Sequence, residues 1–207
     1  MMNDLLRVLL AAADDVGRVF NHAMTARWPP GAVETFRCHG VLRRSAGGLY
    51  APCPNCRDSH VEPVTIRTRP DGTSRFLISC PESLRIEVKA EMCECWEIDP
   101  PGLAEAVARL MGLKGKPQPV VADRFWRLGR APWPPGSGHA REVVLAMRMH
   151  EDDASAIAAH VGPGGRAIVL VPHQMPDKRI WPDAVPAVVP LSQVVSCGGD
   201  GLVLDAG

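Results

Sequence analysis

The chain has 207 residues, which is enough for one large domain or two small ones. Its 23 basic and 23 acidic side chains balance, which removes any global charge argument for a nucleic-acid or membrane partner. The hydrophobic fraction of 46% is normal for a globular protein, and no stretch approaches the roughly 20 apolar residues that span a bilayer, so we expect a cytoplasmic protein without a membrane partner.

The first predicted element is an amphipathic helix that begins at Asn3 and runs to about Phe20. Its apolar positions recur at helical spacing and include Leu5, Leu9 and Val16. The run Trp28-Pro29-Pro30-Gly31 then breaks the pattern, so residues 1–32 form an N-terminal helical segment. The apolar stripe is also a candidate contact for a protein partner, and exposure of its leucines on the isolated chain would favour that role.

Residues 33–99 change to a pattern of short strands separated by turns. The prediction rests on two features of these residues: apolar and polar side chains alternate, and many residues are β-branched or aromatic. The turn Pro70-Asp71-Gly72 indicates a hairpin. The predicted strands are Thr35–Leu42, Val61–Arg67, Arg75–Cys80 and Leu84–Met92.

Residues 100–119 are predicted to hold one helix and a linker. Asp99 precedes Pro100 and Pro101, and proline fits the first turn of a helix because its missing N–H has no partner there. Gly112 ends the helix, and the stretch Leu113–Pro119 has the composition of a linker.

Residues 120–207 alternate strands with a helix, as small α/β domains do. The continuous apolar run Ala167–Val171 is typical of a strand buried on both faces of a parallel sheet. The other predicted elements are strands at Phe125–Leu128, Glu142–Met149, Ala187–Val189 and Leu202–Leu204, a helix at Asp152–Val161 and a helical turn at Leu191–Ser196. We therefore predict an α+β chain: an N-terminal helix, a small β module, and a small α/β domain with a mixed, partly parallel sheet.

Six of the seven cysteines lie between residues 38 and 95, inside the strand-rich segment. Cys53-Pro-Asn-Cys56 is a C-x-x-C pair, which supplies two ligands of a tetrahedral zinc ion from one tight turn. In a reducing compartment, clustered cysteines favour metal binding over disulfides. With the hairpin that follows, residues 53–95 resemble a zinc ribbon. The resemblance implies a structural Zn²⁺ that stabilises the module.

The second half of the predicted zinc site departs from the ribbon pattern. Where a second C-x-x-C is expected, the chain reads Cys80-Pro81-Glu82-Ser83. The favoured ligand set is therefore Cys53, Cys56, Cys80 and Cys95. Three other residues remain alternatives for the third and fourth ligands: Cys38, Cys93 and His60. The opposing interpretation is that these cysteines are small buried hydrophobes.

Basic residues gather in the segment 109–148, which holds eight Lys or Arg against only Asp123 and Glu142. Within it, the stretch Arg124-Phe-Trp-Arg-Leu-Gly-Arg-Ala-Pro-Trp133 interleaves arginine with aromatic residues. Such a surface can contact phosphates and stack bases. The candidate nucleic-acid contacts are Arg124, Arg127, Arg130, Trp126 and Trp133. The competing interpretation is that arginine stems pack beside core tryptophans.

Polar residues also follow two strands of the predicted α/β domain. His150, Asp152 and Asp153 come after one strand and His173 after the other. Ligands gather at the carboxyl ends of parallel strands, so His150, Asp153 and His173 form an alternative catalytic site for a hydrolase or nuclease. Against this, either aspartate can simply cap the following helix.

The remaining motifs favour binding over catalysis. The chain has no G-x-S-x-G, Walker lysine or H-E-x-x-H motif, and its glycine clusters precede strands where phosphate loops precede helices. The sequence thus predicts a non-catalytic zinc-binding protein that contacts nucleic acid through residues 109–148 or a protein through its first helix.

Overall fold

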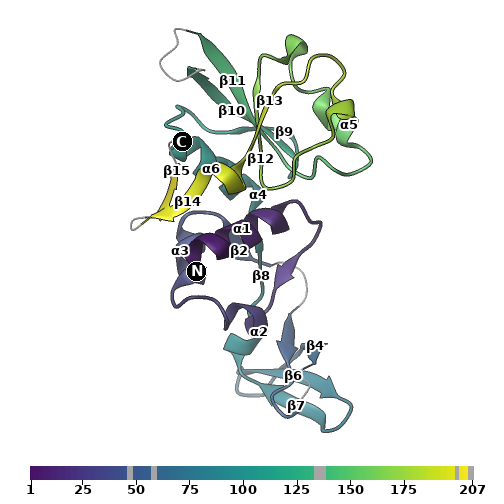
Figure 1. Cartoon of the computed structure of the whole chain (residues 1–207). Helices are drawn as coiled ribbons and strands as arrows, with labels where there is room; N and C mark the ends of the chain where they lie inside the picture. Colours follow the sequence, from purple (N-terminus) through teal and green to yellow (C-terminus); the bar gives the residue numbers. More distant parts are fainter. Residues whose placement is uncertain (46–48, 57–59, 133–138, 199–200, 205–207) are drawn as a thin grey trace. The chain divides into compact units, whose positions relative to one another are not determined.

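The chain is described here by a computed structural model, in which Figure 1 labels the helices and strands. The described residues are 1–45, 49–56, 60–132, 139–198 and 201–204. They divide into two compact units. The α/β unit comprises Met1–Arg18, Glu34–Val41 and Ile98–Gly207, and the β unit comprises Val19–Val33 and Leu42–Glu97.

The α/β unit is built on one five-stranded mixed sheet of order β13-β12-β11-β10-β9. Its strands are β9 (Gln118–Val121), β10 (Phe125–Pro132), β11 (Ala140–Ala146), β12 (Ile168–Val171) and β13 (Ala187–Pro190). β11, β12 and β13 run parallel, whereas β9, β10 and β11 pair antiparallel. The prediction of a mixed, partly parallel sheet is therefore confirmed. All four residues of β12 are buried, as the apolar run predicted.

Helices and a second small sheet complete the α/β unit. They are α1 (Met2–Ala13), α4 (Pro100–Leu110), α5 (Ala154–Ala158), α6 (Leu191–Val194), the 3-10 turns Pro163–Gly165 and Lys178–Ile180, and the antiparallel pair β14 (Val195–Gly198) and β15 (Gly201–Leu204). α5 packs Ile157 and Ala158 into a core that includes Val144 of β11 and Val169 of β12. None of the described helices is long and apolar enough to span a bilayer.

The N-terminal helix α1 is shorter than predicted, and its apolar face is covered within its own unit. Leu5 and Leu9 are buried, and the helix contacts α6 and β14. The helix stops before Asp14 because the carboxylate of this buried residue accepts backbone hydrogen bonds from the sheet edge. Val16, which lies beyond the helix, is exposed.

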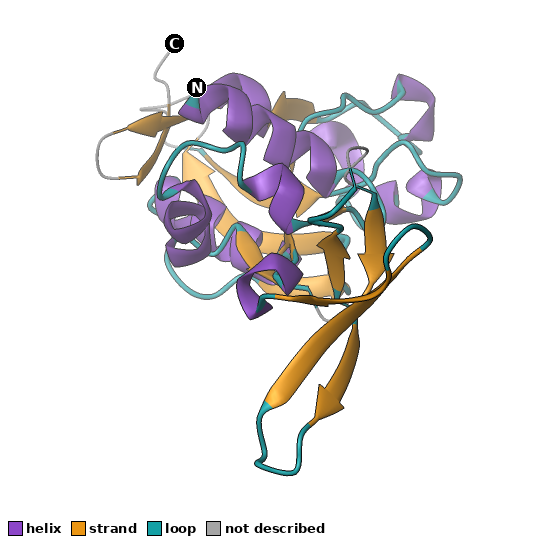
Figure 2. Ribbon diagram, turned by 90° about the horizontal axis from the view of Figure 1, so that it is seen from below, coloured by secondary structure: helices purple, strands orange, loops and turns teal. Residues whose placement is uncertain are grey.

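The β unit holds three small sheets (Figure 2). Its elements are β1 (Val19–Phe20), α2 (His22–Thr25), β2 (Leu42–Arg44), β3 (Tyr50–Pro52), β4 (Val61–Pro63), β5 (Thr65–Thr68), β6 (Ser74–Cys80), β7 (Leu84–Val88), the 3-10 turn Ala90–Cys93 and β8 (Trp96–Ile98). The sheets have the orders β1-β8-β2, β3-β4 and β5-β6-β7. Apolar residues of β6 and β7, Ile78, Ile86 and Val88, pack with the cysteines of this unit.

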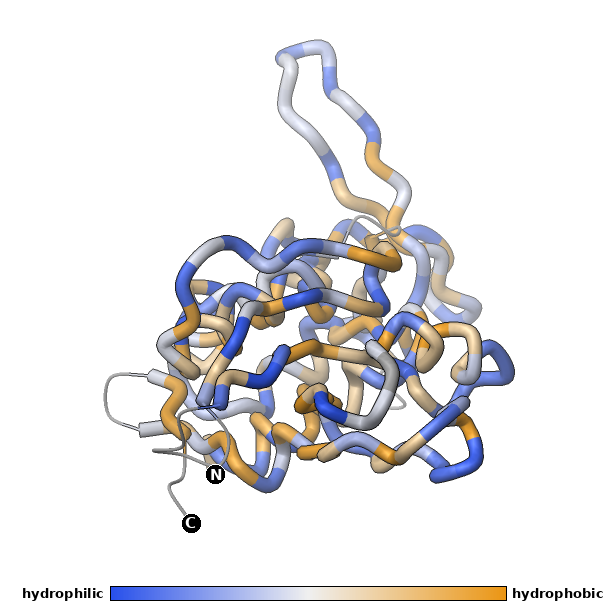
Figure 3. Tube along the Cα trace, turned by 90° about the horizontal axis from the view of Figure 1, so that it is seen from above, coloured by the Kyte–Doolittle hydropathy of each residue, from blue (hydrophilic) through white to orange (hydrophobic). Residues whose placement is uncertain are grey.

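The predicted hairpin turn joins β5 to β6. The turn backbone has φ +83° at Gly72, a conformation that glycine adopts without a steric penalty. Asp71 fixes the turn by accepting hydrogen bonds from the N–H and the hydroxyl of Thr73. The trace of the projecting hairpin is mostly hydrophilic around its turn and more hydrophobic toward its base (Figure 3).

Two strand predictions in this part of the chain are wrong. Instead of a strand at Thr35–Leu42, the chain forms the helix α3 (Ala32–Cys38). Ala32 and Phe36, four residues apart, are its buried positions, and this spacing suits a helix better than a strand. The strand predicted at Leu84–Met92 ends at Val88, where the chain turns into the 3-10 segment.

Candidate metal centre

The hairpin β3–β4 positions three donors around its connection. Cys53 follows β3 directly and His60 precedes β4 directly. The backbone N–H of Cys53 donates to the carbonyl of His60 at 2.8 Å, which continues the pairing of the two strands. Cys56 lies between them in the C-x-x-C turn. Local strand pairing therefore brings the C-x-x-C pair beside an imidazole four residues further along the chain.

Cys80, the last residue of β6, supplies the fourth donor. The ligand atoms of Cys53, Cys56, His60 and Cys80 all lie within 4.8 Å of one another, and the Sγ atoms of Cys56 and Cys80 are 3.3 Å apart. Thiolate sulfurs bound tetrahedrally at about 2.3 Å from zinc stand about 3.8 Å apart. The separations in the cluster bracket this value, so the four donors are close enough to bind a single ion. Among the described residues, no other group of three or more such donors converges.

Burial and mutual hydrogen bonding set the thiol acidities in this cluster. All three cysteines are buried. The hydrogen bond with Cys80, together with burial, raises the pKa of Cys56. Burial acts to raise the pKa of Cys80 as well, but hydrogen bonds from Cys56 and from the backbone N–H groups of Ser83 and Glu82 outweigh it and lower that pKa to about 7. The same hydrogen bond thus moves the pKa values of Cys56 and Cys80 in opposite directions.

His60 tests whether the cluster fits a metal ion. Its Nε2 is the one buried side-chain nitrogen or oxygen in the described part of the chain that has no hydrogen-bond partner. The nearest acidic oxygen, of Glu62, lies 3.8 Å away, beyond hydrogen-bond range. A buried polar atom without a partner is costly, and a metal ion would satisfy it. The three thiols and the imidazole fit a soft or borderline ion that prefers sulfur and nitrogen.

Cys95, favoured from the sequence as fourth ligand, lies outside this group, and so do the alternatives Cys38 and Cys93. The thiol of Cys95 contacts the carbonyl of Tyr50 at 3.8 Å, and that of Cys93 contacts the carbonyl of Lys89 at 3.4 Å. Burial raises the pKa of Cys93. Both side chains are buried, and Cys93 packs in the apolar cluster of the β unit. The C-x-x-C-x-x-x-H spacing is the signal that distinguishes His60 from them.

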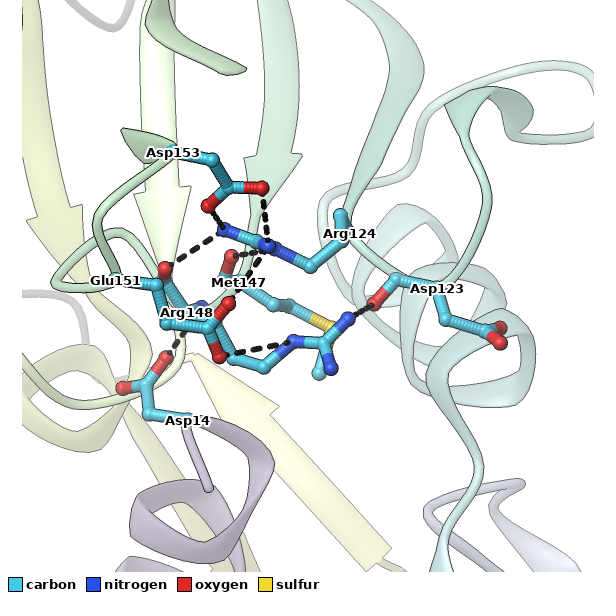
Figure 4. Close-up of polar contacts among 7 residues, drawn as sticks. All are labelled: Asp14, Asp123, Arg124, Met147, Arg148, Glu151 and Asp153. Atoms are coloured by element: carbon cyan, nitrogen blue, oxygen red, sulfur yellow. Dashed lines mark hydrogen bonds and ion pairs between the residues drawn. The ribbon is translucent and has the colours of Figure 1, made fainter. Parts of the chain in front are cut away.

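Arg124, a predicted nucleic-acid contact, is buried in the α/β unit. Its guanidinium donates to the carbonyls of Met147 and Arg148 and to the carboxylates of Glu151 and Asp153, at 2.8–3.2 Å (Figure 4). All of these partners lie in or near the turn that follows β11. Arg124 thus ties β10 to this turn, and its side chain is not presented to a ligand.

The other predicted nucleic-acid contacts in the segment 109–148 differ in exposure. Trp126 is buried. Arg127 is half exposed and pairs with Glu142 at 3.3 Å, and Arg130 is exposed and donates to the carbonyl of Ala140. Trp133 lies outside the described residues. Among its described residues, the segment therefore keeps exposed basic groups, and the predicted stacking residue Trp126 is buried.

The strand-end residues of the α/β unit are separately engaged. Asp153 binds Arg124, and this hydrogen bond lowers the pKa of the aspartate. The ring of His173 contacts the hydroxyl of Ser192 at 3.0 Å, while His150 and Asp152 are exposed.

Asp14 lies at the edge of the sheet where β11 and β12 end. It accepts backbone hydrogen bonds from Arg148, His173 and Gln174 at 2.9–3.1 Å. A side chain of the protein thus fills the position at the carboxyl ends of β11 and β12 where the sequence predicted a ligand. No periodicity or motif marked this residue in advance.

Fold and cluster together define a two-unit α+β protein with a Cys₃His cluster that can hold a metal ion. Scans against models of protein families and searches of curated proteins and of solved structures found no match.

Proposed function

We propose that the chain is a non-catalytic zinc-binding protein that binds nucleic acid and in which structural Zn²⁺ stabilises the β unit. The observation that carries the proposal is the convergence of Cys53, Cys56, His60 and Cys80 within 4.8 Å, with His60 Nε2 buried and unpartnered. Three sulfurs and one imidazole are a common donor set of structural zinc.

The donor set favours a structural role over a catalytic one. A catalytic zinc keeps one coordination position for water or substrate, whereas four protein ligands close the site. The ligands also come from two separate sheets, β3–β4 and β5–β6–β7, and the two-stranded β3–β4 is too small to be stable by itself. An ion shared between them would hold the two sheets together, as in a zinc ribbon, and its binding energy becomes folding energy.

Nucleic acid is the favoured partner because exposed basic side chains remain after internal pairing. In the segment 109–148, Lys114 and Lys116 are exposed, and the structure gives them no ion pair among the described residues. The hydrolase alternative gains no support, because Asp153 is engaged by Arg124 and His173 by Ser192. We therefore assign no reaction to these residues.

The experiment is a zinc and binding assay on the purified chain. We expect one zinc per chain and binding to nucleic acid that weakens steeply with salt, because phosphate contacts release counterions. Cys53→Ser should lose the zinc, and the matched control Cys197→Ser, outside the cluster, should keep it. Well under one zinc per chain in the parent protein would overturn the metal assignment, and salt-independent binding would overturn the phosphate contacts.

A further inference from the structure

The three-stranded sheet β5-β6-β7 has two chemically different faces. In an antiparallel sheet, residues directly opposite one another point to the same side, and neighbours along a strand point to opposite sides. One face carries Ile78, Cys80, Ile86 and Val88, which pack around the metal cluster. The register places Arg67 opposite Arg75 and Ser79 opposite Arg85 on the other face.

This second face is basic. It carries Arg67, Arg75, Arg85 and Glu87. Lys89 follows β7 in extended backbone, so by the same alternation it lies on this face as well. Glu87 is neutralised by Arg75 at 2.6 Å and by Arg69, at the edge of the turn, at 3.3 Å. Among the described residues, the structure gives no hydrogen bond or ion pair to the side chains of Arg67, Arg85 and Lys89, which are exposed. We call these three residues the basic face.

Arg67 lies directly opposite Arg75. Arg75 pairs with Glu87, whereas the structure gives Arg67 no acidic partner among the described residues. Like charges directly opposite each other destabilise an antiparallel pair. An anion bound across the two strands would convert this repulsion into attraction.

We propose that the β5–β6 ribbon enters the major groove of duplex DNA, with Arg67 of the ribbon and Arg85 and Lys89 of the adjoining β7 edge against the phosphates; this inference rests on the nucleic-acid-binding function proposed above. The ribbon has four paired positions on each strand, from Thr65–Leu77 to Thr68–Ser74. Its two strands lie about 4.8 Å apart. The major groove of B-form DNA is about 12 Å wide and admits a two-stranded ribbon.

The chemistry of the ribbon separates duplex DNA from other nucleic acids. All four residues of β5 are exposed, whereas Leu77 on the opposite strand is buried, so β5 is the strand of the ribbon that can approach a groove wall. The major groove of duplex RNA is too deep and narrow for such entry. Single strands are held by stacking on aromatic side chains, and the basic face and its strand neighbours Thr65, Leu77 and Ser79 include none.

The test compares two triple variants of the zinc-loaded protein by fluorescence anisotropy with a 20-base-pair duplex DNA over a salt series. Arg67→Ala/Arg85→Ala/Lys89→Ala removes the basic face. We expect it to weaken binding at least tenfold at low salt and to reduce the magnitude of the slope of log K against log salt by about 2 to 3, at roughly 0.9 per phosphate contact. The charge-matched control, Lys114→Ala/Lys116→Ala/Arg127→Ala, removes three charges from the segment 109–148 and should weaken binding less, and reduce the slope less, than the basic-face variant does.

Each outcome decides a separate point. If the control loses binding and the basic-face variant does not, the contact lies on the segment 109–148, and this inference fails while the proposed function stands. If the parent protein binds duplex RNA or single-stranded DNA more tightly than duplex DNA, groove entry is overturned. If it binds no nucleic acid although it carries one zinc, the proposed binding function fails with this inference and only the metal assignment survives. Retained zinc in both variants shows that they are folded.

Discussion

At the level of single residues, the proposed metal site depends on His60 as its fourth ligand. The imidazole joins the cluster because strand pairing between β3 and β4 places His60 beside Cys53. Cys95, two positions beyond the 3-10 turn, has its thiol at a backbone carbonyl instead. The two possible ligand sets can be distinguished, because they predict opposite effects on metal affinity when His60 or Cys95 is replaced.

We expect His60→Ala to weaken zinc binding more than about tenfold, since even outer-shell changes at metal sites cost 10–100-fold. Cys95→Ser should bind zinc as the parent protein does. Competition with a colorimetric chelator measures both. Equal affinity of His60→Ala and the parent, with loss in Cys95→Ser, would restore the ligand set favoured by the sequence.

Arg124 makes a second prediction at this scale. Replacing it with Ala leaves the Glu151 and Asp153 carboxylates and two carbonyls without their donor, so the free energy of unfolding should fall by about 1–3 kcal/mol. Arg124→Lys keeps the charge but not the fork of donors and should lie between Ala and the parent. Urea unfolding of the three proteins checks this order, and a loss under about 0.5 kcal/mol in Arg124→Ala, the range of ordinary surface substitutions, would contradict it.

Asp153 should make the stability of the folded protein sensitive to acid. Its hydrogen bond to Arg124 holds its pKa below the ordinary value of 3.8. A depressed folded-state pKa gives stability that is present above the unfolded-state value and lost as pH falls through the folded-state value. The parent should therefore lose more stability than Asp153→Asn between neutral pH and pH 3. Parallel stability curves for the two proteins would show that the interaction is not formed in solution.

At the scale of elements, α1 is fixed by its C-terminal Asp14 as well as by its leucines. The carboxylate accepts hydrogen bonds from three backbone N–H groups at the ends of β11 and β12. Asp14→Ala would leave these donors buried and should cost about 3 kcal/mol, with faster amide exchange in α1. Exposed Asp15→Ala is the matched control and should change stability by under about 0.5 kcal/mol. Equal effects of the two substitutions would contradict this role.

The elements also show what the sequence could and could not predict. Periodicity and proline placement were sufficient for α4, β6, β12 and the hairpin turn at Gly72, because local preference and burial agree there. The helix α3 was missed because Thr35 and Phe36 favour strands by composition. The partners of Arg124 and Asp14 are over twenty residues away in sequence, and no local pattern encodes such pairings. The metal cluster was half predictable, since C-x-x-C is local and the choice between His60 and Cys95 depends on tertiary structure.

At the scale of the whole molecule, the two units have different sources of stability. The α/β unit has a continuous apolar core between its sheet and helices. In the β unit, the small apolar cluster is built around the cysteines themselves. Metal removal should therefore act on one unit and leave the other folded.

We expect a strong chelator to accelerate amide exchange in β3, β4 and β6 while the exchange of β11 and β12 is unchanged. Exchange followed by mass spectrometry resolves these segments. Uniform acceleration in both units, or none in either, would show that the ion does not hold the β unit specifically.

The most direct test of the account is the zinc content of the purified chain, measured by mass spectrometry of the metal together with His60→Ala. We expect one zinc per chain in the parent protein, and we expect His60→Ala to lose most of its zinc under mild chelation. A parent protein that is folded and carries well under one metal ion per chain would contradict the central claim.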